Sequence, residues 1–446
     1  MLPMTELRHA IADVTPRLAT GRVLRIAGLI AEGTLPNARL GMLAELEAAG
    51  GVRVPAEVVA VTPRGVALMP LGGVHGITAG ARIVAAPTSP AIRTGPGLLG
   101  RVVDAWVAPL DGKGSIALES LPWRTPLEPA PLNPLDRGLV DTVLPMGVRA
   151  IDAMLTIGAG QRMAILAGAG VGKSTLLAMM VKDSAADVVV VGLIGERGRE
   201  VKEFVERDLG ADGMRRAVVV TATSDQPGAL RIRAAKVATS IAEAFRDQGK
   251  KVLLLIDSLS RVAMAQRELG LAVGEPPATK GYPPSAFAII PRLLERAGPG
   301  LASTGGSITG FYTSLLEGDD LGDPIGDAVK ATTDGHIVLS RTLADRGHFP
   351  AVDVLKSVSR VMLGVVDDSH RASAQTLRAM LADHREVEEL AAIGAYQRGA
   401  VPRFDRALTH WPKVEAWLRQ SAGGAAPVAI TQTLTTLHAL AREVTQ

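Results

Sequence analysis

The chain has 446 residues, no cysteine and nearly balanced charges, with 48 Lys and Arg against 45 Asp and Glu. A formal charge of +3 argues against nucleic acid or an anionic membrane as the main partner, and the lack of cysteine excludes disulfides, thiol catalysis and zinc–thiolate sites. The sequence starts without the apolar core of a signal peptide, and no run reaches the roughly 18 apolar residues of a membrane span, so we expect a cytoplasmic protein.

The first 95 residues predict a short amphipathic helix at 5–14 followed by an all-β region. Short runs rich in Val and Ile, as at 22–26, 56–61 and 65–68, alternate with Gly, Pro and Asn turns. This pattern is typical of a small barrel. We therefore predict that residues 1–95 form a helix plus a β-barrel, and that the Pro-rich stretch at 121–134 is a linker wrapping a surface.

Residues 96–365 are predicted to form an α/β domain, because strand and helix patterns alternate beyond Met146. Helices are predicted at 198–208 and 230–247, among others, and buried strands at 163–166, 188–194, 217–221, 252–256, 307–311 and 336–339. Alternation of this kind indicates a mainly parallel sheet with helices on both faces. Ligands of such sheets bind at the carboxyl ends of the strands.

From residue 366 onward the sequence is typical of helices alone. The periodicity predicts helices at 372–381, 387–398 and 412–419, a loose connection at 422–427 and a last helix at 430–444. Residues 366–446 are therefore predicted to be a helical domain.

A phosphate-binding loop is predicted at 167–175, where the sequence reads AGAGVGKST. Glycines allow successive N–H groups to converge on phosphate oxygens at a helix N-terminus, and a lysine and a hydroxyl then reach the β and γ phosphates and Mg²⁺. Ala167 takes the place of the usual first glycine, which is a mild departure. An ordinary Gly-rich turn is disfavoured by the strand pattern before the loop and the helix pattern after it. The predicted site residues are Ala167, Gly168, Ala169, Gly170, Val171, Gly172, Lys173, Ser174 and Thr175, with Ser174 as a metal ligand.

Two carboxylates follow predicted strands. Asp257 comes directly after VLLLI and could hold a water bound to Mg²⁺, or alternatively cap the next helix. Glu196 follows the strand at 188–194 and could orient or deprotonate the attacking water. On spacing alone, a salt bridge of Glu196 with Arg197 or Arg199 is an equal alternative.

Arginines and aromatic residues are harder to assign from pattern. Arg261 and Arg360 are candidates for the cation that meets the charge developing on the γ-phosphate, although most arginines of a chain are surface residues. Phe349 could stack on adenine or could simply belong to the core.

Five motifs, in order, resemble the catalytic subunits of rotary-type ATPases: AGAGVGKST, GERGREV, LLLIDSLSR, GEPPATKGYPPS and PAVDVLKSVSR. More narrowly, EPPATKGYPPSAFAIIPRLLERAG, GSITGFYTSLLEGDD and DGHIVLSRTLADRGHFPA look like the ATPase of flagellar and type III protein export. The resemblance covers residues 22–398. It implies an N-terminal β-barrel, a RecA-like P-loop core, a C-terminal helical domain and a homohexamer that binds ATP with Mg²⁺ at subunit interfaces.

The resemblance also implies roles for individual residues. Glu196 matches the catalytic carboxylate, and Arg197 and Arg261 match charges near the γ-phosphate. Arg360 matches an arginine finger that enters the neighbouring subunit's site, and Phe349 matches the aromatic residue beside adenine.

Some positions depart from the family pattern. Ser260 and Val262 stand where export ATPases often carry Thr and Phe, and Thr332 and Thr333 stand where they often carry an apolar pair. The acidic segment of ATP synthase β is not present, and its nearest counterpart, Glu386 to Glu389, carries fewer acids, which makes coupling to a proton-driven rotor less expected.

The expected function is that of an ATP hydrolase in a flagellar protein export apparatus, or alternatively in a virulence secretion system. The implied partners are a stator-like regulator at the N-terminal region, a coiled-coil stalk in the ring, export chaperones and their substrate proteins, and an export gate at the inner membrane. Two rivals remain. An RNA translocase would need aromatic platforms in the barrel, where the sequence has none before Trp106, so no nucleic acid is expected. A subunit that binds nucleotide without turnover would be expected to have a neutral residue at the position of Glu196.

Overall fold

The computed structural model describes residues 18–86, 91–316, 318, 320, 322–421 and 428–445. The described chain forms two compact units, one made of the N-terminal strands with Glu268–Pro276, and one made of Ile92–Arg267 and the chain from Pro277 onward. The helix predicted at 5–14 and the connection predicted at 422–427 lie outside the described residues. The boundaries expected at 95/96 and 365/366 stay predictions.

Six antiparallel strands close the predicted barrel in the order β1-β2-β5-β4-β3-β6. Alternate side chains point inward along each strand, so that small and branched residues such as Val23, Leu46 and Ile83 fill the interior. The all-β prediction for this region is confirmed. The strands are β1 (Thr20–Ala27), β2 (Ile30–Thr34), β3 (Leu43–Glu47), β4 (Arg53–Thr62), β5 (Gly65–Pro70) and β6 (Arg82–Ala85).

The second unit is built on a sheet with the order β17-β16-β10-β15-β13-β11-β12-β8, to which β14 adds by pairing with β15. All pairs are parallel except those of β14 and β17. The predicted parallel α/β sheet is confirmed. Its strands are β8 (Val102–Val103), β10 (Arg162–Ala167), β11 (Val188–Ile194), β12 (Ala217–Ala222), β13 (Lys251–Asp257), β14 (Gly298–Pro299), β15 (Ser307–Leu315), β16 (Gly335–Val338) and β17 (Val358–Ser359).

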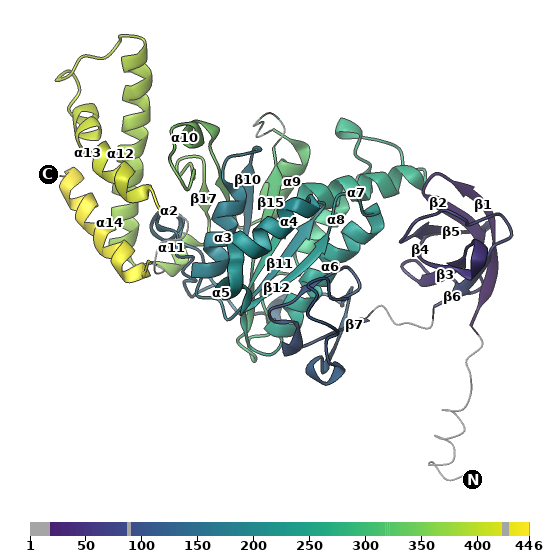
Figure 1. Cartoon of the computed structure of the whole chain (residues 1–446). Helices are drawn as coiled ribbons and strands as arrows, with labels where there is room; N and C mark the ends of the chain where they lie inside the picture. The colour runs from purple at the N-terminus through teal and green to yellow at the C-terminus, as the bar shows by residue number, and fades with distance from the viewer. Residues whose placement is uncertain are drawn as a thin grey trace. The chain divides into compact units, whose positions relative to one another are not determined.

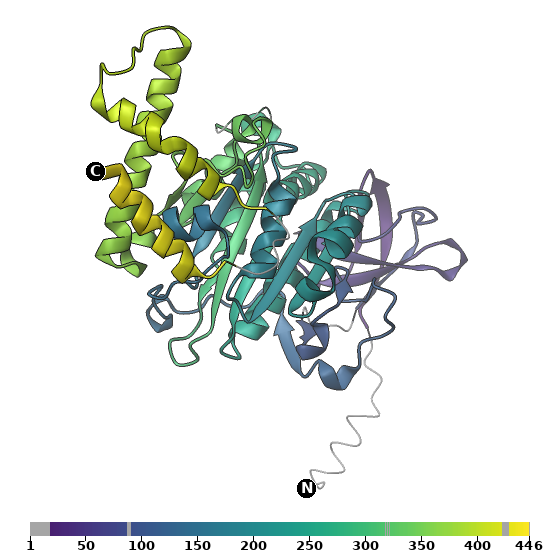
Figure 2. The same ribbon diagram turned by 60° about the vertical axis from the view of Figure 1, so that its left-hand side comes forward.

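Helices cover the sheet, whose strands run side by side through the middle of this unit (Figure 2). The long helix α6 packs against β11, β12 and β13, while α3 lies beside α5 (Figure 1). A π-helix, Phe204–Leu209, continues α4. The helices are α2 (Arg149–Met154), α3 (Lys173–Asp183), α4 (Gly198–Glu203), α5 (Gly210–Met214), α6 (Gly228–Arg246), α7 (Leu259–Ala272), α8 (Pro284–Leu294), α9 (Pro324–Thr332), α10 (Arg341–Asp345) and α11 (Met362–Val365).

The Pro-rich linker predicted at 121–134 contains a strand, β9 (Trp123–Pro126), that pairs with β7 (Ala91–Thr94). The ring of Trp123 meets Phe245 of α6 edge-on, with centroids 5.3 Å apart. The segment therefore packs on the outside of α6 rather than hanging free.

Three helices end the chain: α12 (Asp368–Ala392), α13 (Pro402–Leu418) and α14 (Ile430–Thr445). The separate helices predicted at 372–381 and 387–398 are one helix, because no Gly or Pro interrupts the residues between them, and it stops at Ala392 before Gly394, which has a φ of 71°. The start predicted at Pro412 was wrong. Pro402 opens α13 at a position that needs no N–H donor, and Pro412 lies inside the helix.

The terminal helices share one apolar core with the sheet. Leu377 of α12, Trp417 of α13 and Leu437 of α14 belong to the same buried cluster as Ile151 of α2 and Leu177 of α3. In Figure 1, α12, α13 and α14 lie next to α2. In the part of the chain that the structure describes, no helix has both the length and the apolar character needed to cross a bilayer.

Candidate functional site

The predicted phosphate loop connects the end of β10 to the start of α3. Gly170 and Gly172 have φ values of 76° and 86°, in the left-handed region that favours glycine. Gly168 is not among the residues with positive φ. Gly172 is the N-cap of the eleven-residue helix α3. A Cβ added there would come within 3.1 Å of the Phe349 ring, so this glycine also makes room for an aromatic neighbour. The loop thus presents the N-terminus of a buried helix, the arrangement that binds phosphates.

Lys173 lies between the two predicted carboxylates. Its Nζ donates to Asp257 Oδ1 at 2.5 Å and lies 3.7 Å from Glu196 Oε1. Lys173 begins α3 after the loop that follows β10, while Asp257 ends β13 and Glu196 follows β11, so all three lie where these parallel strands end. The structure therefore brings together the lysine, Asp257 and Glu196 as the sequence predicted.

The alternatives for the two carboxylates fail. Asp257 ends β13 as a buried residue, and the backbone N–H of Arg261 in the next helix bonds to Ser258, not to Asp257. Glu196 contacts Lys173, while Arg197 pairs with Glu200 and Arg199 with Glu203.

Hydroxyl groups on β15 hold the acidic strand end in place. Thr313 Oγ1 donates to Asp257 Oδ1 at 2.7 Å, and Ser314 Oγ lies 2.9 Å from Ser260 Oγ. Ser260 also accepts from the Leu315 N–H at 3.0 Å. The serine at 260, a departure from the family pattern, thus bonds to the same strand, β15, that holds Asp257 through Thr313.

Burial and charge shift the proton affinities of this cluster. Burial disfavours the Lys173 ammonium, but the negative charges of Asp257 and Glu196 outweigh it and raise the pKa of Lys173. Burial, followed by the charge of Asp257, raises the pKa of Glu196 to about 7. A carboxylate with a pKa near the working pH is suited to proton transfer.

We expect the rate of nucleotide hydrolysis to rise with pH up to about 7 and then level off. Only the ionised Glu196 can orient a water and accept its proton, and burial keeps this group protonated to a higher pH than an ordinary glutamate. The measurement is kcat/KM against pH, with binding of a non-hydrolysable analogue measured at each pH to correct for titration of the nucleotide itself. A flat corrected profile across this range would contradict the assignment.

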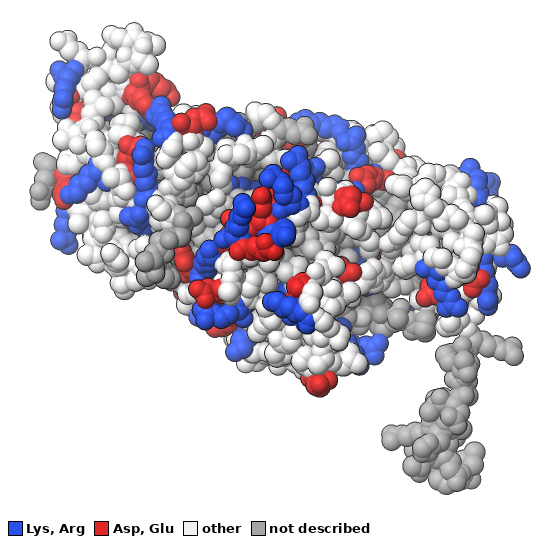
Figure 3. Space-filling model, viewed as in Figure 1, with Lys and Arg blue, Asp and Glu red and all other residues white. Residues whose placement is uncertain are grey.

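The predicted arginines lie apart from one another. The Arg261 side chain packs along Gly195, where an added Cβ would come within 2.8 Å of it, next to Glu196. The Arg197 guanidinium is mostly exposed and lies 3.3 Å from Glu200. Figure 3 shows basic and acidic side chains interleaved on the surface over α4, the helix that follows Arg197. Of the two, Arg261 is therefore the one that the fold holds beside Glu196.

Arg360 lies at the opposite end of the sheet. Its N–H donates to Asp334 O at 3.0 Å and its Nη1 to Thr333 O at 3.1 Å. Asp334 in turn contacts Arg162, the first residue of β10, whereas the phosphate loop follows the last residue of that strand. Five steps of about 3.3 Å between the six residues of β10 separate its two ends by roughly 16 Å. Arg360 thus does not reach the phosphate loop of its own chain.

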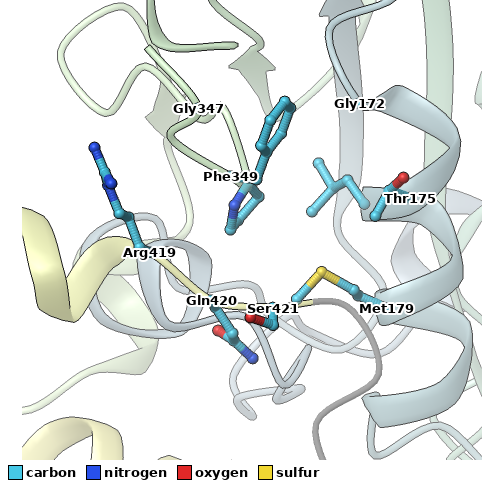
Figure 4. Close-up of a pocket in the computed structure, with 10 residues that line it drawn as sticks. Gly172, Thr175, Met179, Gly347, Phe349, Arg419, Gln420 and Ser421 are labelled. Atoms are coloured by element: carbon cyan, nitrogen blue, oxygen red, sulfur yellow. The ribbon is translucent and has the colours of Figure 1, made fainter.

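A pocket of about 480 Å³ adjoins the phosphate loop (Figure 4). Phe349 faces Thr175 and Met179 of α3 across it, and the segment after α13 closes a further side. Phe349 is 41% exposed, so it is a lining residue and not a core residue. An aromatic ring next to a phosphate loop is placed to stack on a nucleotide base. The lining residues from the segment after α13 are Arg419, Gln420 and Ser421.

Gln420, a lining residue that sequence reasoning missed, connects Phe349 to the residues at the start of α2. Its Nε2 donates to Gly147 O at 2.7 Å, its Oε1 accepts from the Arg149 N–H at 3.0 Å, and its own N–H donates to Phe349 O at 2.8 Å. Gly147 is itself held by the buried Asp152, whose carboxylate accepts its N–H. No local motif marks Gln420, because its partners are far away in sequence. The segment that follows α13 is therefore a wall of the base pocket.

Replacing Gln420 with alanine is expected to raise the KM for the nucleotide about 5- to 30-fold, because two hydrogen bonds of about 1 kcal/mol each are lost at the pocket wall. The carboxylates are not touched, so kcat should change much less. Steady-state kinetics separate the two constants, and Gln432→Ala on α14 provides a control for changes in the helical region. A lower thermal midpoint with an unchanged KM would mean that Gln420 has only a structural role.

Two family profiles match the chain: residues 147–359 match the ATP synthase alpha/beta family, nucleotide-binding domain, and residues 366–439 match the T3SS EscN ATPase C-terminal domain. A type 3 secretion system ATPase of Sinorhizobium fredii is 48% identical, covering 94% of this chain and 92% of the relative. A flagellum-specific ATP synthase of Salmonella typhimurium is 49% identical, covering 90% and 89%. The solved structure of the assembled ATPase EscN from enteropathogenic E. coli superimposes with a TM-score of 0.87 at 42% identity, covering 94% of this chain and 100% of that one.

Proposed function

Because the chain belongs to the ATP synthase alpha/beta family, and within it to the ATPases of type III secretion and flagellar export, we propose that it hydrolyses ATP with Mg²⁺ to drive protein export. The observation that carries the proposal is the contact of Lys173 with Asp257 and Glu196 at the edge of the sheet. These are the groups needed to hold phosphates, place a metal and orient water.

Each group of the site has a proposed role. Backbone N–H groups of the loop and the Lys173 ammonium bind the β and γ phosphates. To reach the phosphates, Lys173 gives up its hydrogen bond to Asp257. Glu196 orients the attacking water and accepts its proton. Arg261, held against Gly195, is placed to meet charge at the γ-phosphate, and we extend this role to Arg197 if it turns inward from Glu200. Phe349 stacks on the adenine.

The chain offers oxygen ligands that suit Mg²⁺. In the described residues no group of three or more His, Cys, Asp or Glu could hold a metal alone. Mg²⁺ typically binds through one or two protein oxygens together with phosphates and water. Ser174, next to Lys173 at the start of α3, and the carboxylate of Asp257 are the oxygens that would hold it. When bound, it neutralises charge on the β and γ phosphates.

We further propose that the working form is a homohexamer in which Arg360 completes the site of the neighbouring chain. Arg360 is exposed at the end of the sheet remote from its own phosphate loop, which supports a role in trans. Loss of an arginine finger costs about 10³ to 10⁵ in rate.

The partners are proposed from relatives. A solved structure of EscN is in complex with its central stalk EscO, and it superimposes on this chain with a TM-score of 0.85. By analogy, we propose a coiled-coil stalk in the ring, chaperones and substrate proteins at the helical region, and a stator-like regulator at the N-terminal region. The place of action is then the cytoplasm, at the export gate of the inner membrane.

Sequence identity does not separate the two types of export machine. Relatives from a secretion system and from a flagellum are 48% and 49% identical. The motif GFYTSLLEGDD leans to the flagellar version and VLKSVSRVM to the injectisome version; we propose the flagellar version, with the injectisome version as the alternative. Glu196 beside Lys173 supports turnover over a nucleotide-binding subunit without it.

Phosphate release from Mg²⁺-ATP by the purified chain tests the activity, with Lys173→Ala as the inactive control. The same Lys173→Ala change in the chromosomal gene tests the coupling, because it should stop secretion of filament or needle subunits into the medium, and the subunit that disappears identifies the machine. Phosphate release at the background rate, or normal secretion by the variant strain, would overturn the proposal.

A further inference from the structure

Asp152 of α2 is a buried carboxyl group to which the proposed hydrolysis gives no role. It is 1% exposed, and in the described part of the chain it takes part in no ion pair. Burial raises its pKa to about 7, although two backbone N–H groups favour the ionised form. A buried carboxylate without a cation costs folding free energy, so its presence at this position calls for a reason.

The Asp152 carboxylate holds the turn that precedes its own helix. Its Oδ1 accepts the Met146 N–H at 2.7 Å and its Oδ2 accepts the Gly147 N–H at 2.9 Å, so both oxygens are used. An ionised carboxylate accepts both bonds, whereas an amide in its place would turn a donor toward one of the two N–H groups. The carboxylate therefore fixes the orientation of two successive peptide groups.

The backbone of Gly147 also packs closely against the end of α3. Gly147 has a φ of 73°, and an added Cβ would clash with the Cβ of Asp183, the last residue of α3. Just beyond α3, the Ala185 N–H donates to Pro145 O at 2.9 Å. The turn at 145–147 is thus packed between Asp152 and the end of the helix that starts at the phosphate loop.

The same turn binds the side chain of Gln420. Gly147 O accepts from Gln420 Nε2 at 2.7 Å, and the Arg149 N–H donates to Gln420 Oε1 at 3.0 Å. In Figure 4 the Gln420 side chain points away from Phe349, while its backbone N–H bonds to Phe349 O at 2.8 Å. The amide side chain is consequently an anchor, and the turn held by Asp152 is what it is anchored to.

We propose that Asp152 is a positioning residue for nucleotide binding, which acts on the base pocket through Gln420. Its carboxylate holds the turn at 145–147 against the start of α2, so that a carbonyl and an N–H stand at the right spacing for the Gln420 amide. Gln420 in turn holds the backbone of Phe349, the residue proposed to stack on the base. The inference rests on the proposed function and adds a residue that acts without touching the nucleotide.

Asp152→Asn is expected to raise the KM for ATP about 3- to 10-fold, the equivalent of one net hydrogen bond, with little change in kcat. The change keeps the size of the side chain but leaves one N–H of the turn facing a donor. The dissociation constant of a fluorescent ATP analogue should rise in parallel at a pH well above 7, where the wild-type carboxyl is ionised. An unchanged dissociation constant overturns the proposal.

Asp104→Asn is the matched control for this variant. The Asp104 carboxylate also accepts two backbone N–H groups, from Trp106 and Ala108, but it lies in the loop after the edge strand β8. Because nothing connects this loop to Gln420, the control should leave the KM unchanged.

A double-mutant cycle tests whether the effect passes through Gln420. If Asp152 acts through the Gln420 amide, adding Asp152→Asn to Gln420→Ala should raise the KM no further than Gln420→Ala alone. Independent effects would instead multiply, and that result overturns the proposed route. A merely structural role of Asp152 predicts such multiplication together with a lower thermal midpoint.

Hydrogen exchange on the wild-type chain gives a readout that does not depend on the folding of a variant. Binding of a non-hydrolysable analogue should slow exchange at the Met146, Gly147 and Gln420 amides together, because coupling is reciprocal. The control amides of Trp106 and Ala108 should not change. Unaltered exchange at Met146 and Gly147 overturns the role of Asp152. Protection without phosphate release from ATP would instead contradict the proposed hydrolysis and leave the role of Asp152 standing, so the two failures are distinct.

Discussion

Replacing Glu196 with glutamine is expected to lower kcat for ATP hydrolysis about 10²- to 10⁴-fold, the usual contribution of a positioned general base. The amide keeps the size of the side chain but cannot accept the proton of the attacking water. It also removes one of the two negative charges at Lys173, so the lysine is freer to bind phosphates and nucleotide affinity should hold or rise.

The effect should appear in kcat and not in the dissociation constant of a fluorescent ATP analogue. Glu203→Gln is the matched control, because Glu203 lies on the same segment and pairs with surface arginines. Turnover of Glu196→Gln within a small factor of the control would mean that another group activates the water.

Replacing Arg360 with alanine is expected to lower kcat about 10³- to 10⁵-fold while the ring still forms. The loss arises because no other cation takes the position of the guanidinium when charge develops on the γ-phosphate. Arg360→Lys should recover only part of the rate, since a lysine lacks the planar, two-pronged donor geometry. Steady-state turnover at a protein concentration where light scattering shows full assembly is the measurement.

If Arg360 acts in the neighbouring chain's site, mixing two inactive variants should restore activity. Mixed rings of Arg360→Ala and Glu196→Gln should contain some sites with both an intact carboxylate and an intact arginine, and these should turn over. Lys356→Ala, a change at an exposed position just before β17, should leave the rate unaltered. An Arg360→Ala protein that assembles and hydrolyses ATP normally would show that the finger lies elsewhere.

The phosphate site could be predicted from sequence because its chemistry is local. The glycines, Lys173 and Ser174 are adjacent, and Glu196 and Asp257 each follow a strand whose pattern is plain, so parallel pairing alone brings them together. The base pocket could not be completed in this way. Gln420 follows a helix in the terminal region, and only the packing of that region on α2 and the sheet brings it to Phe349.

The errors in the helical region have a similar cause. Apolar periodicity indicates where helices exist, but their ends depend on single residues such as Pro402 and Gly394, whose effect depends on position. The arginines illustrate the limit for charged groups. Arg197 and Arg261 fit the same motif-based role, yet only contacts decide that one packs along Gly195 and the other turns to a surface glutamate.

The bonds of Gln420 have a mechanical consequence. They attach the segment just after α13 to Phe349 and to the residues at the start of α2, so a force that draws α13 outward pulls on a wall of the base pocket. Thermodynamic linkage is symmetric. If a bound nucleotide stabilises the attachment of α13, then a force that weakens this attachment lowers the affinity for the nucleotide by the same coupling free energy. A pull on the terminal helices by an engaged polypeptide would therefore lower the affinity of the pocket for its nucleotide.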